Sequence, residues 1–383
     1  MCGIAGIYAI TAEGEKMFPS MYKAVSLMER RGPDCQHVYS DSKVCLGHAR
    51  LSVIDLSDSA SQPLHDSSGR YTIVYNGEVY NYRQLRSRLV DKGYQFNTNS
   101  DTEVILYQYI NDGPKCLDKF IGFFAFAIYD KVEDSLFVAR DRMGQKPLIY
   151  YQGHDSFVFA SEMKALMELG IPRKLDMASL CAYLQFNYIP SPNTIFENVH
   201  KLNPGHYLDV RNGQVKEVRY YSIPYNYSNL EVVDYEDAQK KLRALIEQSV
   251  TDRLVSDVPI GAFLSGGIDS SVIVAEASKH IDNLNTFSIG YADEPFFDET
   301  RYAQLAADKF HTNHQVFKLT NADLYENLFK VLDYIDGDEM YVCDSEATEE
   351  CDKCGLTFLA DHLHTIQDVL TERNQRVCND CNH

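Results

Sequence analysis

The sequence lacks an excess of basic residues. Its 383 residues include 36 Lys and Arg against 55 Asp and Glu, which gives a formal net charge of −19. Binding to nucleic acid or to an acidic membrane surface depends on clustered positive charge. The charge therefore argues against both as partners of this protein.

Long hydrophobic runs are also missing, although 45% of the residues are hydrophobic. No stretch approaches the ~18 consecutive apolar residues that would suggest a membrane span. Residues 1–10 are apolar but have no basic flank and no small-residue cleavage site, unlike a secretory signal. Five of the ten cysteines are scattered over the first 181 residues and five crowd into 343–381, which is not a dense disulfide framework. We expect a cytoplasmic protein with reduced thiols.

The first 210 residues predict an α+β domain. Short segments rich in β-branched and aromatic residues, bounded by Gly, Asp and Asn, are typical of strands. Because many of them are joined by short links, we expect antiparallel sheets with helices on their outer faces. The expected strands are 3–10, 44–54, 71–75, 123–129, 136–139, 148–151 and 157–160.

A polar stretch at 220–229 is typical of a linker, and the pattern changes after it. A long amphipathic helix is followed by strands that alternate with helices, which predicts a doubly wound parallel α/β sheet. The expected strands are 260–264, 286–291 and 314–319, and the expected helices are 270–280 and 298–310. The expected core face of the first helix comprises Leu242, Leu245, Ile246, Ser249, Val250 and Leu254.

Cys2 is the first candidate for chemistry. If Met1 is removed, Cys2 carries both a thiol and a free α-amino group, with ordinary pKa values near 8.5 and about 7.7–8. The amine can take the thiol proton, directly or through a water, and the thiolate can then attack an acyl carbon. A cysteine at this position can also be a small apolar residue on a first strand. Position alone leaves both interpretations open.

The segment 264–271, between an expected strand and an expected helix, is the second candidate. Its two glycines let the backbone approach an anion, while the helix N-terminus and the serine hydroxyls supply donors. It lacks the Gly-Lys-Ser/Thr ending of a Walker loop. The alternative is a plain structural turn, but the flanking strand and helix, with Asp269 placed to reach a metal or nucleotide, favour phosphate binding.

The C-terminal tail carries two Cys-x-x-Cys pairs separated by 23 residues. Such paired thiolates are typical of a structural zinc site, although the separation is usually about 15–20 residues. The alternatives are idle reduced cysteines or a redox pair. We expect a small zinc-ribbon-like tail at 346–383, with Zn²⁺ bound by Cys351, Cys354, Cys378 and Cys381.

Many ordered motifs carry a family resemblance over roughly the first 345 residues. The first 210 residues resemble the glutamine-amidohydrolase domain of class II amidotransferases, the N-terminal-nucleophile type. From about residue 235 the chain resembles the ATP-pyrophosphatase domain of glutamine-dependent asparagine synthetases. The matching segments are 1–4, 31–34, 50–55, 75–81, 100–103, 139–142 with Gly144, 146–148, 160–162, 164–166, 187–190, 201–202, 204–206 and 256–259.

The resemblance implies an αββα sandwich of the N-terminal-nucleophile hydrolases for 1–210, with Cys2 as the nucleophile that hydrolyses L-glutamine. The Asn76 side chain and the Gly77 N–H would hold the oxyanion, where one donor is worth about 3 kcal/mol. Asp101 and Glu78 would receive the α-ammonium group. Arg50 would pair with the α-carboxylate as a planar fork, helped by the backbone of Leu51, Ser52, Val53 and Ile54.

Two of these residues have a simpler interpretation when each is considered alone. Arg50 could form a surface ion pair, and Asp101 could be a helix N-cap placed before Glu103. The family context favours the glutamine-binding roles.

In the second domain, 230–345, the resemblance implies an ATP site. Leu264 and Ile289 match positions that flank the adenine, and Asp269 would act through Mg²⁺. The family uses this site to adenylate L-aspartate, after which ammonia displaces AMP to give asparagine. The matching pyrophosphate loop comprises Ser265, Gly266, Gly267, Asp269 and Ser270.

The resemblance weakens near residue 338. Asp338 and Glu339 match a family Asp-Glu-Pro segment, but Met340 replaces the proline. The family's second Ser-Gly-Glu-Gly-Ser-Asp-Glu loop and its long helical remainder are absent from this sequence. We therefore expect an incomplete synthetase half with exposed sheet faces and marginal stability.

Three functions stay open. The favoured one is a glutamine amidotransferase of the asparagine synthetase type, which uses ATP to amidate aspartate. The second is a family remnant that acts as a binding or regulatory protein through its zinc tail. The third is a glutaminase that delivers ammonia to a separate synthetase subunit. A homodimer is also compatible with the sequence.

Overall fold

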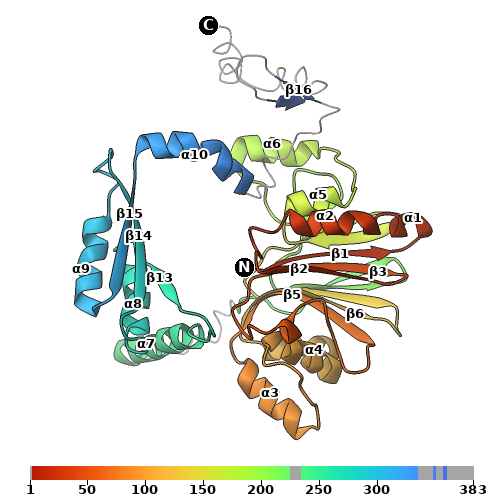
Figure 1. The fold of residues 1–383 in the computed structure, drawn as a ribbon, viewed down its shortest axis with the longest axis horizontal. Helices are drawn as coiled ribbons and strands as arrows, with labels where there is room; N and C mark the ends of the chain where they lie inside the picture. The colour runs from red at the N-terminus through yellow and green to blue at the C-terminus, as the bar shows by residue number, and fades with distance from the viewer. Residues whose placement is uncertain (1, 225–233, 335–347, 351–356, 360–383) are drawn as a thin grey trace.

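The computed structural model describes residues 2–224, 234–334, 348–350 and 357–359 (Figure 1). Within these residues the chain forms two six-stranded sheets, one three-stranded sheet and one two-stranded pair. The two large sheets belong to the N-terminal part and stack on each other, as Figure 1 shows.

Every strand pair in the first large sheet is antiparallel, with β1 and β3 near its centre. Ile4 faces His48 across the β1–β3 pair, and Gly6 faces Leu46. The order of strands is β10 (Val199–Lys201), β8 (Ile149–Gln152), β9 (Ser156–Ala160), β1 (Gly3–Ala9), β3 (Val44–Arg50) and β2 (Cys35–Ser40).

The second large sheet is antiparallel as well. It extends to Arg219, past residue 210, because β11 and β12 form a hairpin on its edge. The order is β12 (Gln214–Arg219), β11 (His206–Arg211), β7 (Ser135–Arg140), β6 (Gly122–Asp130), β5 (Tyr71–Val79) and β4 (Leu64–His65).

Helices cover the outer faces of both sheets, so the order of layers is helix, sheet, sheet, helix (Figure 1). One apolar cluster lies between the sheets and includes Ile4, Leu46 and Phe157. A second cluster lies between the first sheet and its helices, and a third lies between the second sheet and its helices. The first sheet is covered by α2 (Met21–Ser26) and α5 (Met163–Glu168), near α1 (Ala12–Glu15), η1 (Phe18–Ser20) and α6 (Met177–Phe186); the second is covered by α3 (Tyr82–Asp91), α4 (Asp101–Asp112) and η3 (Gly113–Lys119).

The expectation of antiparallel sheets with outer helices is therefore confirmed. One expected strand, 44–54, is too long, because β3 ends at Arg50. Beyond it the chain folds back as a loop that includes η2 (Asp58–Ala60) and the left-handed residue Asp55, with φ +53°. In the two large sheets, the strands β2, β4, β10, β11 and β12 had no counterpart among the expected strands.

The second part of the chain is a small sheet of three parallel strands. Its apolar cluster lies among the helices and includes Val250, Leu264, Val274 and Ala303. The elements in order are α7 (Tyr235–Asp252), β13 (Gly261–Phe263), α8 (Ile268–Ala277), β14 (Asn285–Tyr291), α9 (Thr300–Phe310), β15 (Asn313–Leu319) and α10 (Asn321–Tyr334).

One face of this small sheet is open. Phe263 is 83% exposed, and Ile289 and Phe317 are 54% and 55% exposed. Leu242 and Leu245 of α7 are also exposed, so the expected core face of this helix is buried mainly at Val250. Apolar side chains on this face are therefore open to solvent in the part of the chain that the structure describes.

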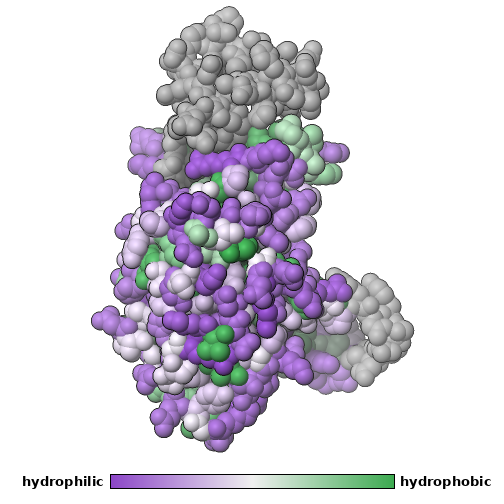
Figure 2. All heavy atoms as spheres, turned by 90° about the vertical axis from the view of Figure 1, so that its right-hand side faces the viewer, coloured by the Kyte–Doolittle hydropathy of each residue, from purple (hydrophilic) through white to green (hydrophobic). Residues whose placement is uncertain are grey.

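None of the helices in the described ranges is both long and apolar enough to cross a membrane. The side of the molecule that carries the two large sheets is mostly hydrophilic, with small separated hydrophobic patches (Figure 2). The strands β16 (Thr348–Glu350) and β17 (Thr357–Leu359) form an antiparallel pair. The four cysteines of the expected zinc site lie outside the described residues.

Candidate functional site

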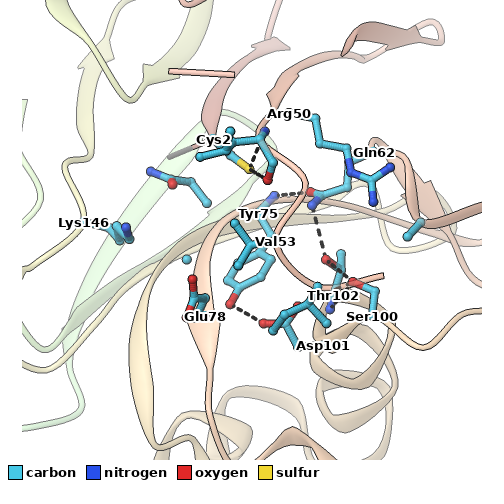
Figure 3. Close-up of a pocket in the computed structure, with 15 residues that line it drawn as sticks. Cys2, Arg50, Val53, Gln62, Tyr75, Glu78, Ser100, Asp101, Thr102 and Lys146 are labelled. Carbon is cyan, nitrogen blue, oxygen red and sulfur yellow. Dashed lines mark hydrogen bonds between the residues drawn. The ribbon is translucent and has the colours of Figure 1, made fainter. Parts of the chain in front are cut away.

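A cavity of about 100 Å³ lies where the start of β1, the loop after β3, the strand β5 and the start of α4 meet (Figure 3). It collects every residue expected to bind glutamine except Ser52, whose N–H donates to the Asp34 carboxylate at 2.6 Å. The lining residues are Cys2, Arg50, Leu51, Val53, Ile54, Ala60, Gln62, Tyr75, Asn76, Gly77, Glu78, Ser100, Asp101, Thr102 and Lys146.

Cys2 lies directly before β1, with its sulfur at the cavity. Its Sγ atom is 3.4 Å from the Leu51 N–H nitrogen, which donates to it, and 3.6 Å from the Leu51 carbonyl oxygen. Its own carbonyl accepts from Arg31 Nε at 3.0 Å. Burial raises the pKa of the Cys2 thiol, whereas the Leu51 N–H and the positive charge of Lys146 lower it. Such donors stabilise a thiolate.

Arg50 ends β3 and is only 6% exposed. Its guanidinium donates to the Ser57 carbonyl at 2.9 Å, to Ser61 Oγ at 3.3 Å and to the Asp55 carbonyl. The surface ion pair considered for Arg50 is therefore wrong. Instead, the side chain fixes the loop after β3 against the cavity.

Asn76 and Gly77 lie side by side on β5. Asn76 is 1% exposed, yet neither its side-chain oxygen nor its side-chain nitrogen has a hydrogen-bond partner among the described residues. Buried amides left without partners are rare in native proteins and call for an explanation. A Cβ atom on Gly77 would lie 2.2 Å from the Phe123 carbonyl oxygen, so only glycine fits against β6. A ligand in the cavity would supply the missing partner of Asn76.

Asp101 is the first residue of α4, and the N-cap is Ser100, whose hydroxyl accepts from the Thr102 N–H at 3.1 Å. The N-cap interpretation of Asp101 is therefore wrong. Its carboxylate points into the interior, where it accepts from the Tyr75 hydroxyl at 2.8 Å and the Val79 N–H at 3.0 Å. Burial raises the pKa of Asp101 despite these donors.

Glu78 carries the second carboxylate of the cavity. Burial, followed by the negative charge of Asp101, raises the pKa of Glu78 to about 7. The two carboxylates thus resist ionising together, as neighbouring like charges do. An ammonium group in the cavity would favour the ionised form of both.

Six lining residues had no role assigned from the sequence: Ala60, Gln62, Tyr75, Ser100, Thr102 and Lys146. Gln62 connects two elements, because its Oε1 accepts from the Tyr75 N–H at 2.6 Å and its Nε2 donates to Thr102 Oγ1 at 3.2 Å. Tyr75, Thr102 and Lys146 lie in segments that match the family, so the family match could have identified them as site residues. Gln62 lies in none.

The second part of the chain touches the loop of this cavity. The Asp257 N–H donates to the Val53 carbonyl at 2.9 Å, and the Asp55 N–H donates to the Asp257 carboxylate at 2.7 Å. Nearby, the Arg253 guanidinium lies 5.0 Å from the centre of the Tyr80 ring. The cavity loop is thus held from both parts of the protein.

The residues expected to bind ATP follow β13 and open α8. The Ser265 and Ser270 hydroxyls are 3.0 Å apart and exposed. Gly266 adopts φ +84°, and a Cβ there would lie 2.5 Å from the Ala303 nitrogen. This compact turn, with exposed hydroxyls at a helix start, fits a polyphosphate.

The two residues expected beside the adenine differ in their exposure to solvent. Leu264 is 1% exposed and packs among the helices, whereas Ile289 is 54% exposed. Asp269 lies in the first turn of α8. No cluster of three or more metal-ligating side chains occurs in the part of the chain that the structure describes.

Comparison with known proteins gives the family. A family model described as a glutamine amidotransferase domain matches residues 1–221, and one described as asparagine synthase matches 241–355. The chain belongs to the glutamine-hydrolysing asparagine synthetase family.

Two relatives come from Bacillus subtilis (strain 168). Asparagine synthetase [glutamine-hydrolyzing] 1 is 38% identical over 304 residues, covering 77% of this chain and 47% of the relative. Asparagine synthetase [glutamine-hydrolyzing] 3 is 34% identical over 346 residues, covering 86% and 56%. The chain thus spans about half the length of these relatives. A solved B. subtilis glutamine phosphoribosylpyrophosphate amidotransferase, complexed with ADP and GMP, has 19% identity and a TM-score of 0.44, covering 82% of this chain and 65% of its own.

Proposed function

We propose that this protein hydrolyses glutamine to glutamate and ammonia with Cys2 as the nucleophile. The observation that carries the proposal is the buried Asn76 amide, which has no hydrogen-bond partner among the described residues and lines the same cavity as Cys2. A tetrahedral oxyanion formed next to Cys2 is the group that such an amide stabilises best.

In the first step, the Cys2 thiol transfers its proton to its own α-amino group, which is free once Met1 is removed. The thiolate then attacks the side-chain carbonyl carbon of glutamine, and its oxygen becomes the oxyanion held by Asn76 and the Gly77 N–H. The C–N bond breaks, the nitrogen takes the proton from the α-amino group, and ammonia leaves. Water hydrolyses the resulting thioester, which releases glutamate and restores the Cys2 thiol.

The free amino-acid end of glutamine gives the site its selectivity. We assign its α-carboxylate to Arg50 and to the backbone of 51–54, and its α-ammonium to Glu78 and Asp101. Glu78 is the more available of the two carboxylates, because Asp101 already accepts from Tyr75 and Val79. A positive charge next to this acidic pair is favourable.

We further propose that the second domain binds ATP and amidates aspartate to asparagine, as the names of the relatives suggest. The loop from Ser265 to Ser270 would hold the phosphates, and Asp269 would act through Mg²⁺. ATP would supply activation of the aspartate carboxylate. The sheet of this domain has an open face, and the chain covers 47% of the length of one relative.

Product analysis with glutamine, aspartate and Mg·ATP tests both proposals. Glutamate together with asparagine and pyrophosphate would support the full reaction. Glutamate without asparagine would limit the activity to glutamine hydrolysis, with the ammonia passing to another acceptor. Absence of glutamate under all conditions would contradict the function proposed for the Cys2 cavity and favour a binding role.

A further inference from the structure

The loop after β7 holds Lys146 in a fixed place. The Asp141 carboxylate accepts from the N–H groups of Gln145 and Lys146, both at 3.0 Å. From the other side, the Arg140 guanidinium donates to the Lys146 carbonyl at 2.7 Å and to the Gly144 carbonyl at 2.8 Å. The backbone of Lys146 is thus fixed by the guanidinium and the carboxylate of two residues that precede it in the same loop.

Gly144 completes this loop. Its φ of +67° is a conformation that glycine adopts at little cost. A Cβ at Gly144 would also lie 2.8 Å from Pro204 Cγ. The positive φ and the close approach to Pro204 explain why glycine is required at position 144. The hydrogen bonds of Arg140 and Asp141 fix the backbone where the loop reaches Lys146.

The Lys146 side chain is only 6% exposed and lines the cavity with Cys2 and Glu78 (Figure 3). Its ammonium nitrogen lies 4.2 Å from the centre of the Phe123 ring. Burial lowers the pKa of Lys146, and the negative charge of Glu78 raises it. Burying an ammonium group is costly, which suggests a use for its charge at this position.

The charged groups around Lys146 come from several elements. Glu78 lies on β5, Asp141 follows β7, Arg31 follows α2, and Cys2 precedes β1. The Arg31 guanidinium pairs with the Glu162 carboxylate at 3.1 Å and donates to the Cys2 carbonyl at 3.0 Å, and its Nη2 has no hydrogen-bond partner among the described residues.

Arg50 donates to the carbonyls of its own loop through Nη1 and Nη2, and its remaining N–H donors are those proposed for the α-carboxylate of glutamine. On the acidic side, Asp101 faces Glu78 and raises its pKa. The positive charge of Lys146 acts in the opposite direction on Glu78 and also on the Cys2 thiol.

We propose that Lys146 is a positioning residue of the glutamine cavity, whose ammonium charge stabilises the Cys2 thiolate and the Glu78 carboxylate together. Both effects lower the pH at which the thiolate and the carboxylate form. The expected change in glutaminase kinetics rests on the function proposed above. The expected effect of Lys146 on the Cys2 thiol does not depend on glutamine.

Lys146→Met and Lys146→Arg test the charge. Methionine keeps an unbranched side chain that suits the buried position, and arginine keeps the charge. The first measurement is the rate of Cys2 alkylation by iodoacetamide against pH, followed on the N-terminal peptide by mass spectrometry. We expect Lys146→Met to move the midpoint upward by about one pH unit, and Lys146→Arg to restore much of the native value. Lys174→Met, which removes an exposed lysine paired with Glu197, should leave it unchanged.

The second measurement is the pH profile of glutaminase kcat/KM, whose acid limb should move upward with the alkylation midpoint in Lys146→Met. Lower activity with both pH midpoints unchanged would show a purely structural lysine and overturn the proposal. If the native protein hydrolyses no glutamine, the proposed function fails, while the alkylation midpoint still decides whether Lys146 acts on the thiol.

Discussion

The Asp257 carboxylate accepts a hydrogen bond at 2.7 Å from the backbone N–H of Asp55, a residue 202 positions earlier in the chain. Asp257 also donates its own N–H to the Val53 carbonyl at 2.9 Å. Val53 lines the glutamine cavity, so a residue of the second domain fixes the loop that closes the first domain's site.

Asp257→Ala should therefore weaken glutamine binding. Loss of a hydrogen bond to a charged group costs about 1.5–3 kcal/mol, so we expect the KM for glutamine to rise by about tenfold or more with a smaller change in kcat. Asp257→Asn keeps an acceptor and should have a milder effect. Asp252→Ala, which changes a carboxylate on α7 that accepts from Gln248 at 2.6 Å, is the matched control. An unchanged KM would show that this contact does not support the loop.

Cys2→Ala should abolish glutamate release and leave the fold intact, because Ala fits the space at the start of β1. Intact mass of the native protein should show that Met1 is absent. Cys181→Ala, at an exposed cysteine, is the control and should stay fully active. Quantitative retention of Met1 in a protein that still hydrolyses glutamine would exclude the α-amino group as the base.

Asn76→Ala separates catalysis from stability. Removal of an oxyanion donor typically lowers kcat by about 10²–10³-fold. Because both amide atoms of Asn76 are buried without partners among the described residues, the substitution also removes a desolvation penalty, and the Tm should not fall strongly. Stopped glutaminase assays and thermal unfolding measure the two effects. A large drop in Tm with kcat preserved would assign Asn76 to the structure instead.

Glu78 should make glutamine binding depend on pH. The pKa of Glu78 is about 7 in the free protein, so the carboxylate is mostly neutral below that pH and mostly ionised above it. The KM for glutamine should therefore fall as the pH rises through about 7. In Glu78→Gln the KM should be higher and lack this dependence. A native KM that stays constant between pH 6 and about 8 would contradict the assignment of the α-ammonium group to Glu78.

The prediction of a zinc site in the C-terminal tail is independent of the Cys2 cavity. Two Cys-x-x-Cys pairs should bind one zinc ion tetrahedrally with Zn–S distances near 2.3 Å. Metal removal by a chelator should make residues after about 345 sensitive to protease, while the amidotransferase domain stays resistant. Cys351→Ser should have the same effect as the chelator. Metal content near zero in protein purified under reducing conditions would leave the idle-cysteine interpretation.

The sequence by itself was sufficient to predict those features that depend on residues close together in the chain. Segments rich in β-branched and aromatic residues, joined by short links, predicted the antiparallel sheets, because strands that are joined by short loops pair in opposite directions. Cys2 was identified from its position in the chain, and Asn76 and Gly77 from a segment that matches the family. The extent of β3 was missed, since the chain turns after Arg50 to make contacts that are distant in sequence.

Only the tertiary structure decided what surrounds these residues. It directs Arg50 onto loop carbonyls, joins Asp101 to the Tyr75 hydroxyl, and leaves the Asn76 amide with no hydrogen-bond partner among the described residues. It also brings Lys146 into the cavity of Cys2. These relationships depend on packing between elements far apart in the chain, and burial then sets the pKa values through desolvation, which no local pattern of residues encodes.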